Sequence, residues 1–194
     1  SGELPRWDLG YLGTYAEDRQ PALDRLLLEP ARRMPDKRFV VAGPQYPDEI
    51  SWPDNVERID HLPPAEHPSF YSCCRFTLNI TRREMVKAGW SPSVRLFEAA
   101  ACGSAILSDA WPGLEELLPP GEALLTVEDS EAVIAALGEA GSGLASERAE
   151  RARERVLRGH TGKRRAEQLE EVIKEATAAR TCGLQKEKRH ALSS

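Results

Sequence analysis

The residue types best suited to chemistry are concentrated in residues 89–109, which read GWSPSVRLFEAAACGSAILSD. A loop rich in serine and proline leads into a short amphipathic helix, predicted over residues 93–102, and a buried strand follows. The first turn of a helix carries unpaired backbone N–H groups and the positive end of the helix dipole, so an anion can bind there. Arg95 adds a cation one turn in, and Glu98, three residues later, shares its face. A cation for phosphate beside a carboxylate for sugar hydroxyls is the chemistry that a nucleoside-diphosphate ligand requires.

The elements around this segment alternate between strands and helices at short spacing. Strands are predicted at residues 7–15, 38–42, 56–59, 76–80, 105–108 and 123–127, and helices at residues 21–34, 68–74, 93–102, 114–118 and 130–139. This alternation predicts an α/β fold with a Rossmann-like, parallel six-stranded sheet and helices on both faces. Ligands on such sheets bind beyond the carboxyl ends of the strands. The loops after Leu12, Ile59, Ile80 and Leu107 are therefore expected to meet at one cleft.

The chain is expected to fall into three parts. Residues 1–143 form the α/β lobe, residues 144–179 form charge-rich C-terminal helices, and residues 180–194 lack periodicity and are expected to be a disordered tail. The helical segment either packs on the lobe or is a solvated surface helix, and the sequence favours neither reading.

Composition excludes several classes of protein. The net charge of −5 argues against general nucleic-acid binding, which usually requires a basic surface. No apolar run is long enough to span a membrane, and the start shows no signal-peptide pattern. The cysteines Cys73, Cys74, Cys102 and Cys182 show no metal-binding spacing, so free thiols in a reducing cytosol are expected. We therefore expect a cytoplasmic protein.

One stretch also carries a family resemblance. SPSVRLFEAAACG, followed by a strand and then by DAWPGLEEL, resembles the donor-binding lobe of group 1 glycosyltransferases with the GT-B fold. Within that group it is most similar to the CgeB-like branch, the spore-maturation type, and the resemblance covers roughly residues 7–175. It implies a C-terminal lobe, either excised from a longer protein or a natural one-lobed relative. The implied function is to bind a nucleotide sugar, with UDP favoured, for transfer of a sugar to an unknown acceptor.

The resemblance also implies a donor site. Its residues are Gly13, Thr14, Arg19, His61, Leu62, Ser91, Ser93, Val94, Arg95, Glu98, Asp109 and Gly113. Residues 93–95 would cradle the diphosphate, Glu98 would bind the ribose hydroxyls, and residues 61–62 would receive the base through backbone groups. Gly13 would let the loop approach the pyrophosphate closely, because a Cβ would be in the way there.

Each of these residues has a plainer structural reading that stays open. Gly13 also suits an ordinary turn between a strand and a helix, and Arg19 suits an exposed helix start. Arg95 could form a surface ion pair with Glu98. Glu98 could equally be a glutamate on the helix surface.

Further candidates follow the next two predicted strands. Asn79 ends one of them and could reach phosphate or sugar. Asp109 follows the other and could bind sugar hydroxyls, while Trp111 beside Gly113 would form an apolar wall of the sugar site. The family places this second loop near the donor sugar.

The chain departs from the family at Trp90. Many retaining members carry a second glutamate eight residues before the one that matches Glu98, and here that position is Trp90. The catalytic residues and the stereochemistry therefore stay unknown, and Trp90 could pack on a sugar or base face or lie in the core. No Asp-x-Asp motif is present, so no metal and no cofactor beyond the donor is expected. The absence of G-x-G-x-x-G argues against a nicotinamide enzyme.

Two functions remain open at this point. The first is one lobe of a hexosyltransferase-like enzyme, incomplete without an N-terminal acceptor lobe on the same or a partner chain. The alternative is a non-catalytic module that binds nucleotide sugars or docks a partner, with the charged C-terminal helices as the docking surface. A different Rossmann-like enzyme is a third and weaker reading.

Overall fold

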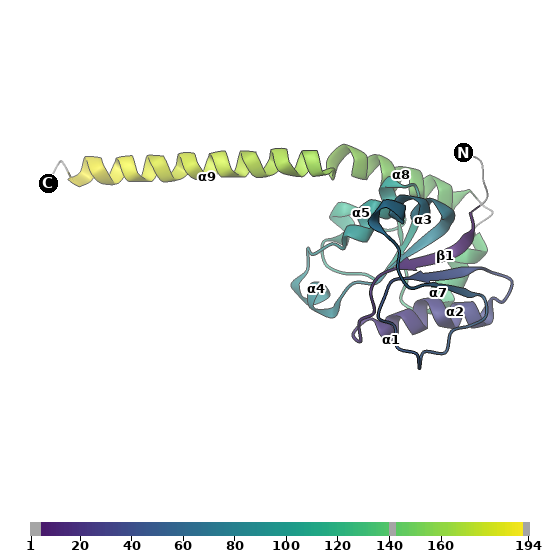
Figure 1. Cartoon of the computed structure of the whole chain (residues 1–194). Coiled ribbons are helices and arrows are strands. Elements are labelled where there is room, and N and C mark those ends of the chain that lie inside the picture. The colour runs from purple at the N-terminus through teal and green to yellow at the C-terminus, as the bar shows by residue number, and fades with distance from the viewer. Residues whose placement is uncertain (1–4, 140–142, 192–194) are drawn as a thin grey trace. The chain divides into compact units, whose positions relative to one another are not determined.

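The computed structural model describes residues 5–139 and 143–191. The chain divides into two compact units, Ser1–Val156 and Leu157–Ser194. Figure 1 shows the elements of the first unit, which is the α/β lobe. The helical segment predicted from residue 144 is therefore divided between the two units at Leu157.

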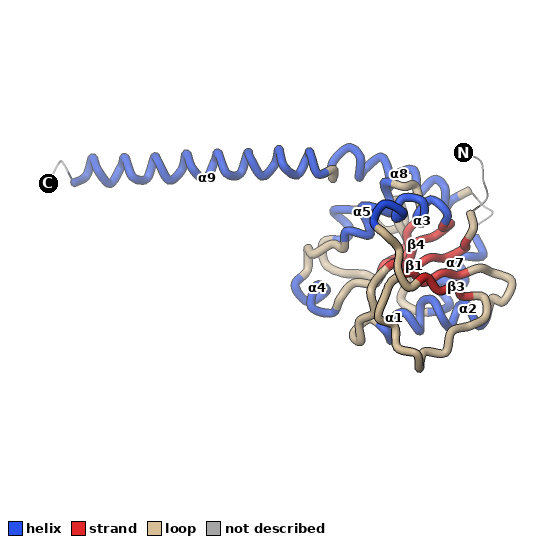
Figure 2. The backbone as a smooth tube through the Cα atoms, in the orientation of Figure 1, coloured by secondary structure: helices blue, strands red, loops and turns tan. Residues whose placement is uncertain are grey.

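The lobe is built on a parallel sheet. Its strands are β1 (Trp7–Leu12), β2 (Phe39–Ala42), β3 (Val56–Ile59), β4 (Cys74–Asn79), β5 (Ala105–Ser108) and β6 (Leu125–Thr126). Their order is β3-β2-β1-β4-β5-β6, and every neighbouring pair is parallel. Figure 2 shows the strands in red, with helices around them. The predicted fold class is thus confirmed. The strand order reverses between β1 and β4, which is the point where such sheets bind ligands.

The helices lie on both faces of this sheet. They are α1 (Gln20–Leu23), η1 (Asp24–Leu28), α2 (Glu29–Arg33), η2 (Pro64–Glu66), α3 (His67–Cys73), α4 (Arg83–Ala88), α5 (Val94–Ala101), α6 (Leu114–Leu117), α7 (Ser130–Gly138) and α8 (Leu144–Gly159). Figure 1 shows α1, α2 and α7 on one side of the sheet and α3 and α5 on the other.

Successive side chains along the strands pack alternately into two hydrophobic cores, one on each face of the sheet. In β2, Phe39 and Val41 pack with the α1–α2 segment and α7, whereas Val40 and Ala42 pack with α3 and α5. A period of two is what a strand buried on both faces requires. The second core also includes Ala152 of α8, so the start of α8 belongs to the lobe.

The helix predicted over residues 21–34 is present but contains a wider turn. A π-helical turn, η1, separates α1 from α2, and the Glu29 N–H donates to the Asp24 carbonyl. Pro30, the second residue of α2, has no N–H for the carbonyl four residues earlier, and its ring would clash with that carbonyl in a regular α-helix. The π turn relieves this conflict.

Other boundaries also differ from the prediction. The last strand is shorter than the predicted range 123–127. It covers only Leu125–Thr126, because the chain turns at Gly121 just before it. Cys74 opens β4 instead of closing α3, with no loop between the two elements. No helix is predicted between residues 81 and 92, yet α4 forms there. Its C-cap is Gly89, whose φ of 64° is in the left-handed region that favours glycine.

The second unit consists mainly of one long helix, α9 (Gly162–Ala191). The bounds of α9 extend past residue 180, where the disordered tail is predicted, and that tail stays a prediction. Residues 192–194 of that tail, and residues 1–4 and 140–142 of the predicted lobe, lie outside the described residues.

Candidate functional site

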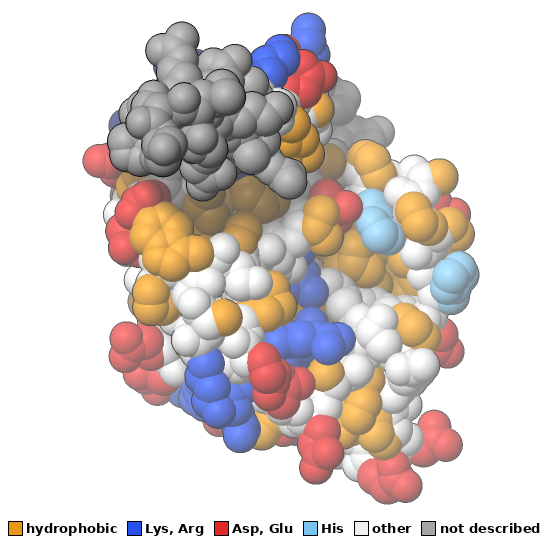
Figure 3. Space-filling view, turned by 90° about the vertical axis from the view of Figure 1, so that its left-hand side faces the viewer, with side chains coloured by type: hydrophobic (Ala, Val, Ile, Leu, Met, Phe, Trp, Pro, Cys, Tyr) orange, Lys and Arg blue, Asp and Glu red, His pale blue; other side chains and the backbone are white. Residues whose placement is uncertain are grey.

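A cavity of about 400 Å³ opens at the carboxyl ends of β1, β2 and β3, beside the start of α5. It is lined by Leu12, Gly13, Thr14, Gly43, Pro44, His61, Leu62, Pro64, His67, Tyr71, Ser93, Val94, Arg95 and Glu98. Most of the predicted donor-site residues are in this set. Figure 3 faces the side of the lobe on which α4 lies, where the surface is hollowed beside histidine side chains and close to Lys or Arg side chains.

Two glycines that line the cavity hold the loops after β1 and β2 in close contact. A Cβ on Gly43 would lie 2.1 Å from the carbonyl oxygen of Gly13, and the φ of Gly43 is +138°. A Cβ on Gly13 would lie 2.8 Å from Nη2 of Arg95. Both positions therefore require glycine, one for the approach of the two backbones and the other for the approach of the guanidinium.

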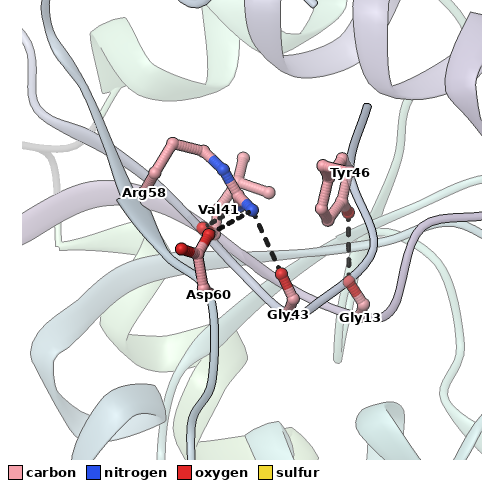
Figure 4. A network of polar contacts seen from close by, with 6 residues as sticks. All are labelled: Gly13, Val41, Gly43, Tyr46, Arg58 and Asp60. Atoms are coloured by element: carbon pink, nitrogen blue, oxygen red, sulfur yellow. Dashed lines mark hydrogen bonds and ion pairs between the residues drawn. The ribbon is translucent and has the colours of Figure 1, made fainter. Parts of the chain in front are cut away.

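A half-buried arginine, Arg58 on β3, ties down the loop after β2. Its Nη2 donates to the Gly43 carbonyl at 3.1 Å and its Nη1 donates to the Val41 carbonyl, while Asp60 lies 3.5 Å away (Figure 4). Burial lowers the pKa of Arg58 from its ordinary value. The guanidinium therefore fixes the backbone on which Gly43 sits.

Aromatic rings complete this support. The guanidinium carbon of Arg58 lies 4.3 Å from the ring centre of Tyr46 and 4.5 Å from that of Trp52. The Tyr46 hydroxyl in turn donates to the Gly13 carbonyl at 3.0 Å (Figure 4). Burial raises the pKa of Tyr46, which keeps this hydroxyl a donor. Sequence reasoning missed this cluster, because its members come from separate loops and strands.

Arg95, the predicted phosphate ligand, is buried, with only 6% of its surface exposed. Its Nε donates to the Leu12 carbonyl at 2.7 Å, its Nη1 donates to Oδ1 of Asn79 at 3.0 Å, and its guanidinium lies 4.7 Å from the ring centre of Tyr11. Among the described residues no carboxylate lies within ion-pair distance of it, so the reading as a surface ion pair with Glu98 is wrong. A buried cation held only by neutral groups favours an anionic ligand.

The start of α5 adds to this preference for anions. Ser93 is the N-cap, and its Oγ accepts from the Arg95 backbone N–H at 3.4 Å. Ser93 and Val94 line the cavity, and Val94 is largely exposed. The positive end of the helix dipole thus opens at the cavity beside Arg95.

Glu98 lines the cavity and is held from one side by α3. Its Oε2 accepts from the Tyr71 hydroxyl at 3.0 Å and lies 3.8 Å from Nδ1 of His67. Burial, with the neighbouring Glu98 charge, raises the pKa of Tyr71 and keeps it protonated. Sequence reasoning missed Tyr71 and His67, although their spacing of four residues on a helix places them on one face. Glu98 is therefore a fixed carboxylate and not a freely moving surface glutamate.

Two predicted site residues near these loops do not line the cavity. Arg19 is buried beneath the loop after β1, where its Nη2 donates to the Thr14 carbonyl at 2.6 Å. Its Nε is buried with no hydrogen-bond partner among the described residues. Ser91 lies in the loop between α4 and α5, outside the cavity lining. Arg19 thus supports the Thr14 loop from below.

The loops after β4 and β5 line a second cavity of about 270 Å³, so the four predicted loops do not meet at one cleft. Asp109 lies in this second cavity, where it accepts from the backbone N–H of Thr81 at 3.0 Å and from its Oγ1 at 2.9 Å. Burial raises the pKa of Asp109 despite these bonds. Asp109 thus lines a different cavity from Arg95, on the side of α1 and η1, and its role in donor binding stays a prediction.

Gly113 and the two candidate tryptophans are also outside the first cavity. Gly113 has φ +98°, and a Cβ there would lie 2.7 Å from the ring of Trp90. Trp90 is 58% exposed and has the left-handed φ of +52°, whereas Trp111 is buried in the core around α5. The apolar wall predicted from Trp111 is therefore part of the core, and Trp90 is the exposed ring.

The described residues contain no group of three or more His, Cys, Asp or Glu side chains placed to hold a metal ion. None of the helices in the described ranges combines the length and apolar character that crossing a bilayer requires. Cys73, Cys74 and Cys102 are free thiols.

A family model matches most of the chain. The glycosyl transferase-like family matches residues 19–171. No curated protein matches the chain significantly by sequence.

Solved structures show the same fold. Sucrose-phosphate synthase from Thermosynechococcus elongatus superposes with a TM-score of 0.71 at 18% identity, over 91% of this chain and 47% of that one. T4 phage BGT, solved in complex with its UDP-glucose substrate, gives 0.67 at 15%, over 91% and 50%. The C-terminal domain of a glycosyl transferase group 1 family protein, LpcC from Francisella tularensis, gives 0.64 at 16%, over 82% and 88%. The lobe thus has the fold of a GT-B glycosyltransferase lobe and spans about half the length of the two longer chains.

Proposed function

The chain belongs to the glycosyl transferase-like family, and from this premise we propose that its first cavity binds the nucleotide-sugar donor of a glycosyltransferase. The observation that carries the proposal is the buried Arg95 guanidinium, which has only neutral partners among the described residues and lies at the start of α5. A diphosphate would supply the missing negative charge. T4 phage BGT binds UDP-glucose with a similar fold, which favours a UDP-linked donor.

The other cavity residues suit the remaining parts of such a donor. Glu98, held by Tyr71, can accept hydrogen bonds from ribose hydroxyls through its second oxygen. His61 and Leu62 line the cavity, and their backbone groups would receive the base. A volume of about 400 Å³ is within the range of small-ligand sites.

In the reaction, this lobe would hold the donor and stabilise the diphosphate as it leaves. Arg95 and the dipole of α5 act on the charge that develops on the leaving group. The two longer relatives extend over about twice the matched region. We infer that a second lobe supplies the acceptor site and the catalytic base, and that it belongs to the same protein or to a partner chain. No residue of this chain is assigned as the base.

Finer assignments belong to the same proposal. The stretch SPSVRLFEAAACG supports the CgeB-like branch, and a hexose is the sugar that we propose. A cytoplasmic location agrees with the free thiols but stays a prediction.

The proposal is tested by thermal unfolding with UDP, GDP, ADP, dTDP and NAD. A nucleotide present at about 100 times its dissociation constant adds about 2.7 kcal/mol, which shifts the Tm of a lobe of this size by about 5–10 °C. We expect one nucleoside diphosphate to give this shift in the wild type and none in Glu98→Ala. Arg151→Gln is a matched control, because Arg151 is an exposed residue of α8. The proposal fails if no nucleotide shifts the Tm, or if NAD alone does.

A second candidate is the binding or docking module, and one observation favours it. Leu169, Val172 and Ile173 of α9 are more than half exposed, which is unusual for three apolar residues so close together. The glycosyltransferase lobe and the binding module differ in whether a bound nucleotide sugar is turned over. Binding of a UDP-sugar without release of UDP, in the presence of the acceptor lobe, would favour the module.

A further inference from the structure

Asn79, at the carboxyl end of β4, is fully buried. It contacts Arg95 of the first cavity and Asp109 of the second. Its Oδ1 accepts from Nη1 of Arg95 at 3.0 Å. Its Nδ2 donates to Oγ of Ser108 at 3.0 Å and has longer contacts with Oγ1 of Thr81 and Oδ1 of Asp109, at 3.3 and 3.4 Å. The orientation of the amide is thus determined, because Arg95 can only donate and an ionised Asp109 can only accept.

The amide therefore separates two opposite charges. Asp109 is a partly buried carboxylate on one side of Asn79, and Arg95 is a buried cation on the other. A carboxylate at position 79 would face the guanidinium directly and would neutralise it at short range. With an amide there, Arg95 is fixed in position and its charge stays available to the first cavity.

We propose that Asn79 is a positioning residue that orients Arg95 toward the donor diphosphate and keeps the Asp109 charge from neutralising it. The inference rests on the proposed function and deepens it. Asn79 does not line the cavity, and we expect it to affect only the binding of the phosphate part of the ligand. The base and the ribose bind elsewhere in the cavity and should not depend on it.

The test exchanges the two groups in the double variant Asn79→Asp with Asp109→Asn, which leaves the net charge unchanged. The amide introduced at position 109 can accept from the Thr81 N–H and donate to the carboxylate introduced at position 79, so the hydrogen bonds of the cluster are largely kept. Dissociation constants for UDP and for uridine are measured by titration calorimetry. We expect UDP affinity to fall roughly tenfold or more and uridine affinity to change less than about twofold.

A matched control is Thr77→Val on β4, the strand of Asn79, which removes the buried hydrogen bond from Thr77 to Ser104 without touching Arg95. It should leave the ratio of UDP to uridine affinity unchanged. An equal loss of both ligands in the double variant, or no loss of either, would overturn the inference. If the wild-type chain binds neither ligand, it is the proposed function that fails, and the two failures are thereby distinguished. Asn79→Ser serves if the double variant does not fold, and it should lower UDP affinity alone.

Discussion

The carboxyl edge of the sheet has two halves, and they differ in how their charged side chains are partnered. Beyond β4 and β5, the second cavity is lined by side chains of both charges, and the Arg25 cation there is exposed to solvent. Beyond β1 and β2, Arg95 is buried against carbonyl, amide and ring groups, with no carboxylate partner in the described residues. The first half thus holds a buried cation without a charged partner among the described residues. This unpaired guanidinium is the reason for assigning the ligand site to the first half.

The largest effect should come from the glycine pair that shapes the first half. Gly43→Ala places a Cβ 2.1 Å from the Gly13 carbonyl oxygen, so the two loops must separate. We expect a loss of roughly 3 kcal/mol or more in the free energy of unfolding, measured by urea denaturation. Gly121→Ala is the control, because Gly121 also has positive φ but nothing lies within 4 Å of its Cβ position. It should cost only about 1–2 kcal/mol. Equal losses would show that the contact between the loops is unimportant.

The comparison between the halves is tested most directly by removing one arginine from each. Arg95→Gln should weaken UDP binding about 10–100-fold, since a hydrogen bond to a charged group contributes about 1.5–3 kcal/mol. Arg25→Gln, in the second cavity, should leave UDP binding unchanged. Calorimetric titration of both variants provides the measurement. A comparable loss in Arg25→Gln would mean that the second cavity also takes part in donor binding.

A smaller effect should follow from removing the support of Glu98. Tyr71→Phe deletes the hydroxyl that donates to Oε2 of Glu98 and keeps the ring in the core. We expect about threefold to tenfold weaker binding of uridine and UDP alike, because the ribose contact is affected and the diphosphate contact is not. Tyr15→Phe is the control, since its ring contact with Tyr46 is kept. A loss confined to UDP would contradict the assignment of Glu98 to the ribose.

The smallest effect concerns pH and the second half. Burial raises the pKa of Asp109 in the folded protein above its ordinary value of 3.8. The folded state therefore holds this proton more tightly than the unfolded state does. The resulting stabilisation is complete below the ordinary value and is lost as pH rises through the raised one. Asp109→Asn should accordingly gain stability relative to the wild type as pH rises from about 4 to about 7, measured by urea denaturation. A difference that is constant with pH would show that the carboxylate is solvated.

Local signals in the sequence predicted the parts of the site that depend on neighbouring residues. The start of α5 follows from residue type and spacing, and the structure has it, with Ser93 as the N-cap. The partners of Arg95 and Glu98 could not be predicted in this way. Asn79 and Tyr71 reach them from other elements, and which residues meet depends on the register of the sheet and on how α3 packs.

The two tryptophans illustrate the same limit. Trp90 and Trp111 both lie in loops near small residues and prolines, and the sequence gives no reason to place one inside and the other outside. In the structure the Trp90 ring lies over Gly113 and stays exposed, while Trp111 is buried in the core, and this depends on how the two loops pack. The split of the predicted cleft into two cavities has a similar cause, since it depends on the face of the sheet toward which each loop turns.

The contact between Gly13 and Gly43 also has a consequence for how this chain can diverge. A substitution at either position is obstructed by atoms of the other loop or of Arg95, so neither glycine can change alone while the cavity is kept. The two positions are 30 residues apart in sequence. In descendants of this chain that keep the cavity, we expect both glycines to be kept. Joint loss of both glycines would therefore mark a relative that has abandoned the site, even where the sheet is unchanged.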